Sequence, residues 1–153
     1  MGYVLRLYSK ARLENIENLT ELVTESWRRK TTAQIAILGC NNGAQSIILT
    51  RGISSKDLWG IDIDADALKG ASGQGVLTIR ADLERCLPFK SESFDVVISN
   101  QVIEHLEDVD TFICEVHRIC RKDGIAILST ENLASVDNIL ALILGYQAFS
   151  QNI

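Results

Sequence analysis

The chain has 153 residues, a length typical of one domain, and its 46% hydrophobic and 23% charged residues are an ordinary globular mixture. The net charge of −5 argues against a nucleic-acid partner, and the most apolar stretch, residues 139–144, is far too short to span a membrane. The four cysteines form no CxxC pair and no secretory leader is recognisable, so we expect a cytoplasmic protein with free thiols.

Helical periodicity comes first along the chain. Apolar residues at helical spacing predict an amphipathic helix over residues 11–29; they are Leu13, Ile16, Leu19, Leu22, Val23 and Trp27. Five short apolar runs follow, each typical of a buried strand, over residues 34–38, 58–62, 75–80, 94–99 and 124–129.

Helical segments are expected between most of these strands. They cover residues 42–50 and 64–71, and Asp64 is the predicted N-cap of the second. A third helix precedes the last strand and is predicted to stop at Gly124. Its apolar face consists of Val109, Phe112, Ile113, Val116 and Ile119. Residues 81–93, which contain the single proline, are expected to be irregular.

Apolar strands that alternate with helices indicate a parallel sheet covered on both faces. With right-handed crossovers this gives an α/β, doubly wound, Rossmann-like fold. We expect a single domain over residues 1–153, in which residues 1–30 form an N-terminal helical segment. Residues 31–132 would form a ligand-binding core and residues 133–153 a C-terminal apolar helix.

Ligands of such sheets bind at the carboxyl ends of the strands, so the residues after each strand are candidate site residues. After the first strand stand Gly39, Cys40, Asn41, Asn42 and Gly43. Glycines there permit positive φ and let a nucleotide approach the backbone. A turn between strand and helix also needs glycine for its own geometry, so this motif alone leaves both interpretations open.

Acidic residues follow the next two strands. The Asp62 carboxylate can accept hydrogen bonds from both hydroxyls of a ribose. Asp82 can accept from an adenine amino group, while the Leu83 N–H donates to a ring nitrogen. In the alternative interpretation, Asp62 and Asp64 cap a helix and Asp82 is a solvated loop acid.

Polar residues also follow the fourth strand. Asn100 and Gln101 lie next to the expected reacting centre. His105 is a candidate general base, because its ordinary pKa lies near neutrality. The alternative is a hydrogen-bonded structural histidine.

Five segments together resemble the class I S-adenosylmethionine-dependent methyltransferases, particularly the small-molecule group called type 11. In family order they are residues 35–43 (IAILGCNNG), 59–71 (WGIDIDADALKGA), 81–89 (ADLERCLPF), 93–106 (SFDVVISNQVIEHL) and 123–132 (DGIAILSTEN). The resemblance implies a mostly parallel sheet of order 3-2-1-4-5 and S-adenosylmethionine as the cofactor. It also implies methyl transfer to an O, N or C nucleophile of a small molecule.

The resemblance also assigns roles around the cofactor. The implied binding residues are Gly39, Cys40, Asn41, Gly43, Asp62, Ile63, Asp82, Leu83, Asn100 and Gln101. The first four would line the methionine part, Asp62 would hold the ribose, and Ile63 would pack on the adenine. Asp82 and Leu83 would read the adenine edge, and the last two would lie near the methionine amine and the methyl group.

A related pattern holds a divalent cation in ubiquinone-pathway O-methyltransferases. It corresponds here to Gln101, Glu104 and His105, in which Gln101 replaces a carboxylate, so no metal is expected.

The chain departs from the family at three places. Ile37 stands where the family usually has Asp or Glu, and Asn41 stands where it usually has Gly. Family members normally add two more strands after the fifth. We expect both to be lacking here, either because the chain is a fragment or because the protein is a reduced form of the family. The last helix would then leave apolar surface for a homodimer.

Two rival functions follow from these departures and from the fold. One is a catalytically impaired S-adenosylmethionine-binding or scaffold module, supported by the altered first motif. The other is a nicotinamide-dependent dehydrogenase, which the missing GxGxxG fingerprint disfavours, since three residues separate Gly39 from Gly43.

Overall fold

The computed structural model describes residues 15–27 and 32–130 of the chain. Residues 15–26 are helical, which confirms the described part of the predicted N-terminal helix. The predicted C-terminal apolar helix, and with it the predicted homodimer contact, lies outside the described residues. Within the part of the chain that is described, no helix has both the length and the apolar character needed to cross a membrane.

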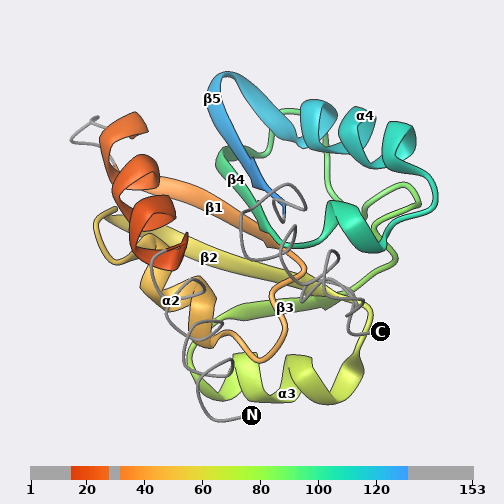
Figure 1. Ribbon diagram of the computed structural model, residues 1–153, viewed down its shortest axis with the longest axis horizontal. Helices are drawn as coiled ribbons and strands as arrows, with labels where there is room; N and C mark the ends of the chain where they lie inside the picture. Colours follow the sequence, from red (N-terminus) through yellow and green to blue (C-terminus); the bar gives the residue numbers. More distant parts are fainter. Residues whose placement is uncertain (1–14, 28–31, 131–153) are drawn as a thin grey trace, which may run out of the picture.

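A parallel sheet of five strands forms the centre of the fold (Figure 1). The strands are β1 (Ala33–Leu38), β2 (Ser55–Asp62), β3 (Leu77–Arg80), β4 (Phe94–Asn100) and β5 (Cys120–Ser129). Their order is β3-β2-β1-β4-β5, and every neighbouring pair is parallel. The predicted doubly wound fold and its strand order are therefore confirmed, with the topological switch between β1 and β4.

Helices cover both faces of this sheet (Figure 1). They are α2 (Ala44–Thr50), α3 (Ala65–Gly73), α4 (Val109–Ile119) and the short 3₁₀ helix η1 (Ile103–His105). The N-terminal helical segment, α2 and α3 bury Val23, Leu49 and Leu68 against one face. On the other face α4 packs through Phe112, together with Leu87 of the β3–β4 connection.

The first strand supplies side chains to both layers. Its sequence AQIAIL is buried at every position except Gln34, which is half-buried. Ile35 and Ile37 belong to one core cluster, whereas Ala36 and Leu38 belong to the other. This is the period of two that a strand imposes on its side chains, and it explains why a central strand is a continuous apolar run.

The helix after β2 begins where the sequence predicts. Asp64 is the N-cap of α3, and its side chain accepts hydrogen bonds from the N–H groups of Asp66 at 2.8 Å and Ala67 at 3.3 Å. The prediction of Asp64 as a capping residue is confirmed. Two of the backbone donors left open by the first turn of the helix are thereby satisfied.

The boundary between α4 and β5 differs from the prediction. The expected helix stop at Gly124 is wrong, because α4 ends at Ile119 and β5 begins at Cys120. A Cβ atom on Gly124 would lie 2.8 Å from the carbonyl oxygen of Asp95. Glycine is therefore needed here for the close approach of two strands at an irregularity in their register.

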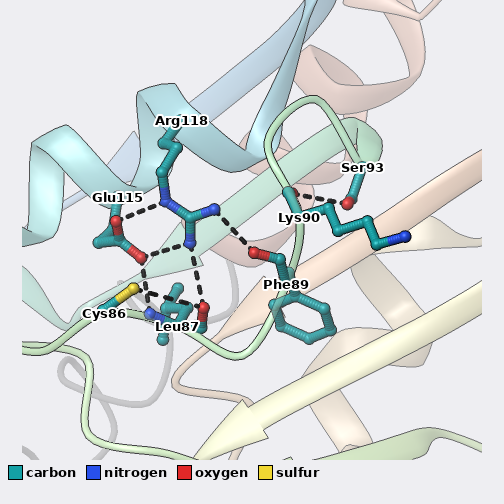
Figure 2. Close-up of polar contacts among 7 residues, drawn as sticks. All are labelled: Cys86, Leu87, Phe89, Lys90, Ser93, Glu115 and Arg118. Atoms are coloured by element: carbon teal, nitrogen blue, oxygen red, sulfur yellow. Dashed lines mark hydrogen bonds and ion pairs between the residues drawn. The ribbon is translucent and has the colours of Figure 1, made fainter.

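The connection between β3 and β4 is irregular, as predicted, but it is firmly held by α4 (Figure 2). Glu115 and Arg118 form an ion pair of 2.6 Å, with side chains 11% and 27% exposed. The Leu87 N–H donates to Glu115 at 2.6 Å, and Arg118 donates to the carbonyls of Phe89 at 2.7 Å and Leu87 at 3.0 Å. A mostly buried acid and base thus satisfy the backbone of a segment that has no regular structure of its own.

This clamp gives a prediction for stability. The hydrogen bond from Arg118 and, less strongly, that from the Leu87 N–H hold the pKa of Glu115 below its ordinary value of 4.5 against the opposing effect of burial. Because the folded state lowers this pKa, Glu115 stabilises the protein at neutral pH, and its contribution is lost as the pH falls through the folded-state value. Glu115→Gln should lower the free energy of unfolding by about 2 kcal/mol at pH 7.

Urea titrations at pH 7 and at lower pH measure both effects. Asp66 forms a similarly spaced ion pair with Lys69, but these side chains are 86% and 78% exposed, so Asp66→Asn is a matched control that should change little. The difference between wild type and Glu115→Gln should shrink on acidification. A pH-independent difference, or an equal effect of Asp66→Asn, would contradict the role given to the clamp.

Candidate functional site

The carboxyl ends of the strands meet at one edge of the sheet (Figure 1). Leu38, at the end of β1, pairs with Ile61 of β2 and with Ser99 of β4. Asp62 in turn pairs with Arg80 of β3. The segments after these strands, which contain the predicted site residues, are therefore brought together by the sheet.

Asp62 joins two of these segments. Its Oδ2 accepts a hydrogen bond of 2.7 Å from the Asn41 N–H in the turn after β1. Its Oδ1 accepts one of 3.0 Å from the Asp64 N–H at the start of α3. A carboxylate oxygen has two acceptor directions, so each oxygen retains one for a further donor. Asp62 is thus a structural link between the turns and remains a hydrogen-bond acceptor at the edge of the sheet.

The turn after β1 requires glycine because of the surrounding protein. Gly39 and Gly43 have φ values of 76° and 83°. A Cβ on Gly39 would lie 2.4 Å from Cγ2 of Val102, and one on Gly43 would lie 2.9 Å from Cα of Ala71. Two reasons for these glycines are possible, ligand approach and turn geometry, and packing and positive φ are sufficient by themselves.

Asparagine at position 41 fits this turn. Its φ is 47°, in the left-handed region that Asn tolerates better than most residues. Its Oδ1 accepts from the Asn42 N–H at 2.6 Å, and the Asn42 Oδ1 accepts from the Ala44 N–H at 3.2 Å. The turn therefore keeps its left-handed conformation without the glycine that the family usually has.

Cys40 contributes its backbone to the edge and its side chain to the core. The residue is 3% exposed, and its Sγ would lie 2.7 Å from a Cβ on Gly60. Burial, and secondarily the negative charge of Asp62, raises the pKa of the thiol to about 11. The thiol is therefore neutral near pH 7 and is not a nucleophile there.

The segments after β2 and β3 present an apolar side chain and a carboxylate. Ile63 is 60% exposed, and its carbonyl accepts from Arg80 Nε at 2.9 Å. Asp82 accepts from the Glu84 N–H at 3.0 Å and from Arg85 Nε at 3.1 Å. Leu83 is buried, so its contribution to a site would come from its backbone.

Asn100 is fixed from two sides at the end of β4. Its Nδ2 donates to Gln45 Oε1 of α2 at 3.2 Å, and its Oδ1 accepts from Ser129 Oγ of β5 at 2.5 Å. The Gln101 N–H donates to the Ser129 carbonyl at 2.9 Å, and Gln101 has a φ of 58°. A positive φ is uncommon outside glycine.

His105 belongs to η1 and is exposed. Its neighbour Glu104 accepts a hydrogen bond of 3.0 Å from Thr130 Oγ1. In residues 15–27 and 32–130 there is no group of three or more His, Cys, Asp or Glu side chains that could hold a metal ion.

The altered position in β1 lies inside the protein. Ile37 is 3% exposed and belongs to the core cluster that also contains residues of the N-terminal helical segment. A carboxylate at this place would have to be desolvated on folding, whereas isoleucine is not penalised in this way.

Sequence reasoning missed the residues that hold the site residues in place. They are Gln45 and Ser129 around Asn100, Val102 over Gly39, and Glu84 next to Asp82. Gln45, Val102 and Ser129 make contacts between elements that are far apart in the chain, so no local pattern indicates them. Glu84 lies two positions after Asp82, but its side chain accepts from the N–H groups of Glu107 and Asp108, which are distant in the sequence.

These features place the chain in a known family. A family model described as a methyltransferase domain matches residues 37–128, which is more than half of the chain. The protein belongs to this family, the class I S-adenosylmethionine-dependent methyltransferases.

Two curated relatives and one solved structure illustrate the similarity. The biotin biosynthesis bifunctional protein BioHC of Saccharophagus degradans is 30% identical over 110 residues, which are 68% of this chain and 19% of that protein. The ubiquinone biosynthesis O-methyltransferase of Sinorhizobium fredii is 32% identical over 100 residues, 62% of this chain and 40% of that protein. The crystal structure of the PH0226 protein of Pyrococcus horikoshii has a TM-score of 0.64 at 26% identity, over 76% of this chain and 57% of that chain. The chain thus spans well under half of these curated relatives.

Proposed function

We propose that this domain binds S-adenosylmethionine at the carboxyl edge of its sheet and transfers the methyl group to an O, N or C nucleophile of a small molecule. The arrangement around Asp62 supports this most directly. Its carboxylate connects the glycine-containing turn after β1 to the start of α3 and retains one acceptor direction on each oxygen. Two adjacent ribose hydroxyls need a pair of acceptors of this kind.

The other residues of the edge fit the remaining parts of the cofactor. The exposed Ile63 offers an apolar surface for the adenine, and Asp82 offers a carboxylate for its amino group. The turn from Gly39 to Gly43 would line the methionine part, with Asn100 and Gln101 near the amine and the methyl group. Acidic side chains at this edge also favour a sulfonium cation electrostatically.

The protein's own contribution to the reaction would be to bind, orient and exclude water. When bound, S-adenosylmethionine supplies an electrophilic methyl group whose leaving group is a neutral thioether. Asn100, held by Gln45 and Ser129, would keep a fixed orientation next to the reacting centre. Where the nucleophile of the acceptor carries a proton, His105 would act as the general base that removes it.

The acceptor that we propose is a small molecule in the cytoplasm. The names of the relatives support this class, because they refer to ubiquinone and biotin biosynthesis. No nucleic-acid or membrane partner is proposed, in keeping with the net charge of −5.

Isothermal titration calorimetry with S-adenosylhomocysteine tests the proposed role of Asp62. Asp62→Ala removes a charged acceptor for the ribose and should weaken binding by roughly tenfold or more. It also releases two backbone N–H groups, so thermal unfolding must show that the variant remains folded. Asp82→Ala should weaken binding as well.

Asp66→Ala is the matched control, because it removes an exposed acid in the first turn of α3. The control should bind as wild type does, and NAD should not bind to any of the proteins. Equal affinity of folded Asp62→Ala and wild type would overturn the assignment of Asp62. Binding of NAD in place of S-adenosylhomocysteine would overturn the proposed cofactor.

A second candidate function is a non-catalytic binding or scaffold module. The observation that favours it is the burial of Ile37 in an apolar cluster, where the resemblance implies an acidic residue near the methionine end of the cofactor. Ile37 thus packs well in β1 but supplies no negative charge that would help to hold the ligand.

Restoring the family residues separates the two functions. The double variant Ile37→Asp, Asn41→Gly should bind S-adenosylmethionine about tenfold more tightly if the rest of the pocket is intact. Burying a carboxylate should at the same time lower the stability of the free protein, which thermal unfolding without ligand measures. Asn41→Gly alone separates the effect of the turn from that of the buried charge. A folded double variant with no gain in affinity would favour the scaffold function.

A further inference from the structure

Glu84 connects the turn after β3 to the loop that follows β4. Its side chain extends from the turn after β3 to the start of α4, where Oε1 accepts from the Asp108 N–H at 2.6 Å and also from the Glu107 N–H. Asp108 is the N-cap of α4, so these two donors lie at the end of the loop that follows β4. The link crosses from one loop to the other through a single oxygen atom.

The same link continues to Asp82. The Glu84 N–H donates to Asp82 Oδ1 at 3.0 Å, which fixes the backbone of Glu84 relative to the carboxylate that we propose for the adenine amino group. Asp82 is held in turn by Arg85 Nε at 3.1 Å. The chain of bonds therefore runs from the adenine end of the site, through Glu84, to the N-terminus of α4.

The loop that receives this link contains the residues next to the reacting centre. It is fixed at its other end by the bond from the Gln101 N–H to Ser129, and the next residue, Val102, packs over Gly39. His105 lies between these points and the two amides bound by Glu84. Movement of the α4 end of this loop would therefore displace the segment that includes His105.

The position of Glu84 is not explained by attraction to the side chains around the first turn of α4. Glu107, Asp108 and Asp110 are acidic and lie around the first turn of α4, so they disfavour another carboxylate there. The two backbone donors and the positive end of the helix dipole offset this repulsion. The contact therefore depends on the two backbone hydrogen bonds and the helix dipole and not on an ion pair.

We propose that Glu84 is a positioning residue that couples the adenine end of the site to the acceptor-side loop of residues 101–108. Adenine bound next to Asp82 would restrict the movement of Asp82 and of the turn after β3. Through its bonds to the Glu107 and Asp108 N–H groups, Glu84 would then also restrict the loop that contains His105. This inference rests on the proposed function, because it requires the adenosine to bind next to Asp82. Since coupling is reciprocal, loss of the link should also weaken adenosine binding.

Amide hydrogen exchange with and without S-adenosylhomocysteine, combined with calorimetry, tests the coupling. In wild type the ligand should slow the exchange of the Glu107 and Asp108 amides. In Glu84→Ala these amides should exchange faster and no longer respond to the ligand, and the Kd should rise about fivefold, at the low end of measured couplings.

Two variants serve as controls. Glu84→Gln keeps an oxygen that can accept both N–H groups, so it should restore most of the ligand response. Glu107→Gln removes a charge at the same place but keeps the backbone donor, so it should behave as wild type does.

The outcomes are distinguishable. If wild type binds the ligand but Glu84→Ala keeps both the affinity and the exchange response, the coupling is wrong while the proposed function stands. If Glu84→Ala loses stability but keeps the ligand response at Glu107 and Asp108, Glu84 is merely structural and the coupling is again wrong. If wild type does not bind the ligand, the proposed function fails, and the coupling fails with it.

Discussion

The rest of the site depends on the two backbone hydrogen bonds that the Asp62 carboxylate accepts. One fixes the turn after β1 and the other fixes the start of α3, at 2.7 Å and 3.0 Å. Asp62 reaches the Asn41 N–H because it ends a strand that is parallel to β1 and directly beside it. It reaches the Asp64 N–H because that residue lies two positions further along the chain. These bonds fix the turn relative to the carboxyl edge of the sheet without the help of a ligand. A rigid sheet preorganises the residues on its connecting loops in this way.

A second constraint acts on the opposite face of the sheet. The β3–β4 connection has no regular hydrogen bonding of its own, and the Glu115–Arg118 pair of α4 satisfies its backbone (Figure 2). This pair holds the backbone of Leu87 and Phe89, whereas Glu84 belongs to the part of the connection next to β3 and bonds the start of α4. The two sets of contacts together attach the β3–β4 connection to the N-terminal and the C-terminal parts of α4.

The fold was predictable because it follows from patterns within single elements. The apolar run of β1 and the capping residue Asp64 each indicate local structure directly, and the resemblance supplied the order of the strands. The stop at Gly124 was predicted wrongly, because glycine has two uses that look identical in sequence: ending a helix and allowing two strands to approach closely.

The positions of the candidate site residues at the strand ends were also predictable, but their supports were not. Gln45 and Ser129 hold Asn100 across more than one element, and such pairs have no characteristic spacing. Cys40 shows the same limit, because the sequence does not distinguish a backbone at the edge from a side chain in the core. Whether a residue offers its side chain or its backbone is decided by tertiary packing.

Mapping of amide chemical shifts by NMR during titration with S-adenosylhomocysteine shows directly where the ligand binds. The shifts should concentrate on residues 39–43, 62–64, 82–84 and 100–101, at the carboxyl edge of the sheet. The amides of Gln34, Asp57 and Asp95, which belong to the hydrogen-bonded network at the opposite edge, should not move. Shifts confined to that opposite edge, or no shifts at ligand saturation of a folded protein, would contradict the claim that this domain binds adenosine where its parallel strands end.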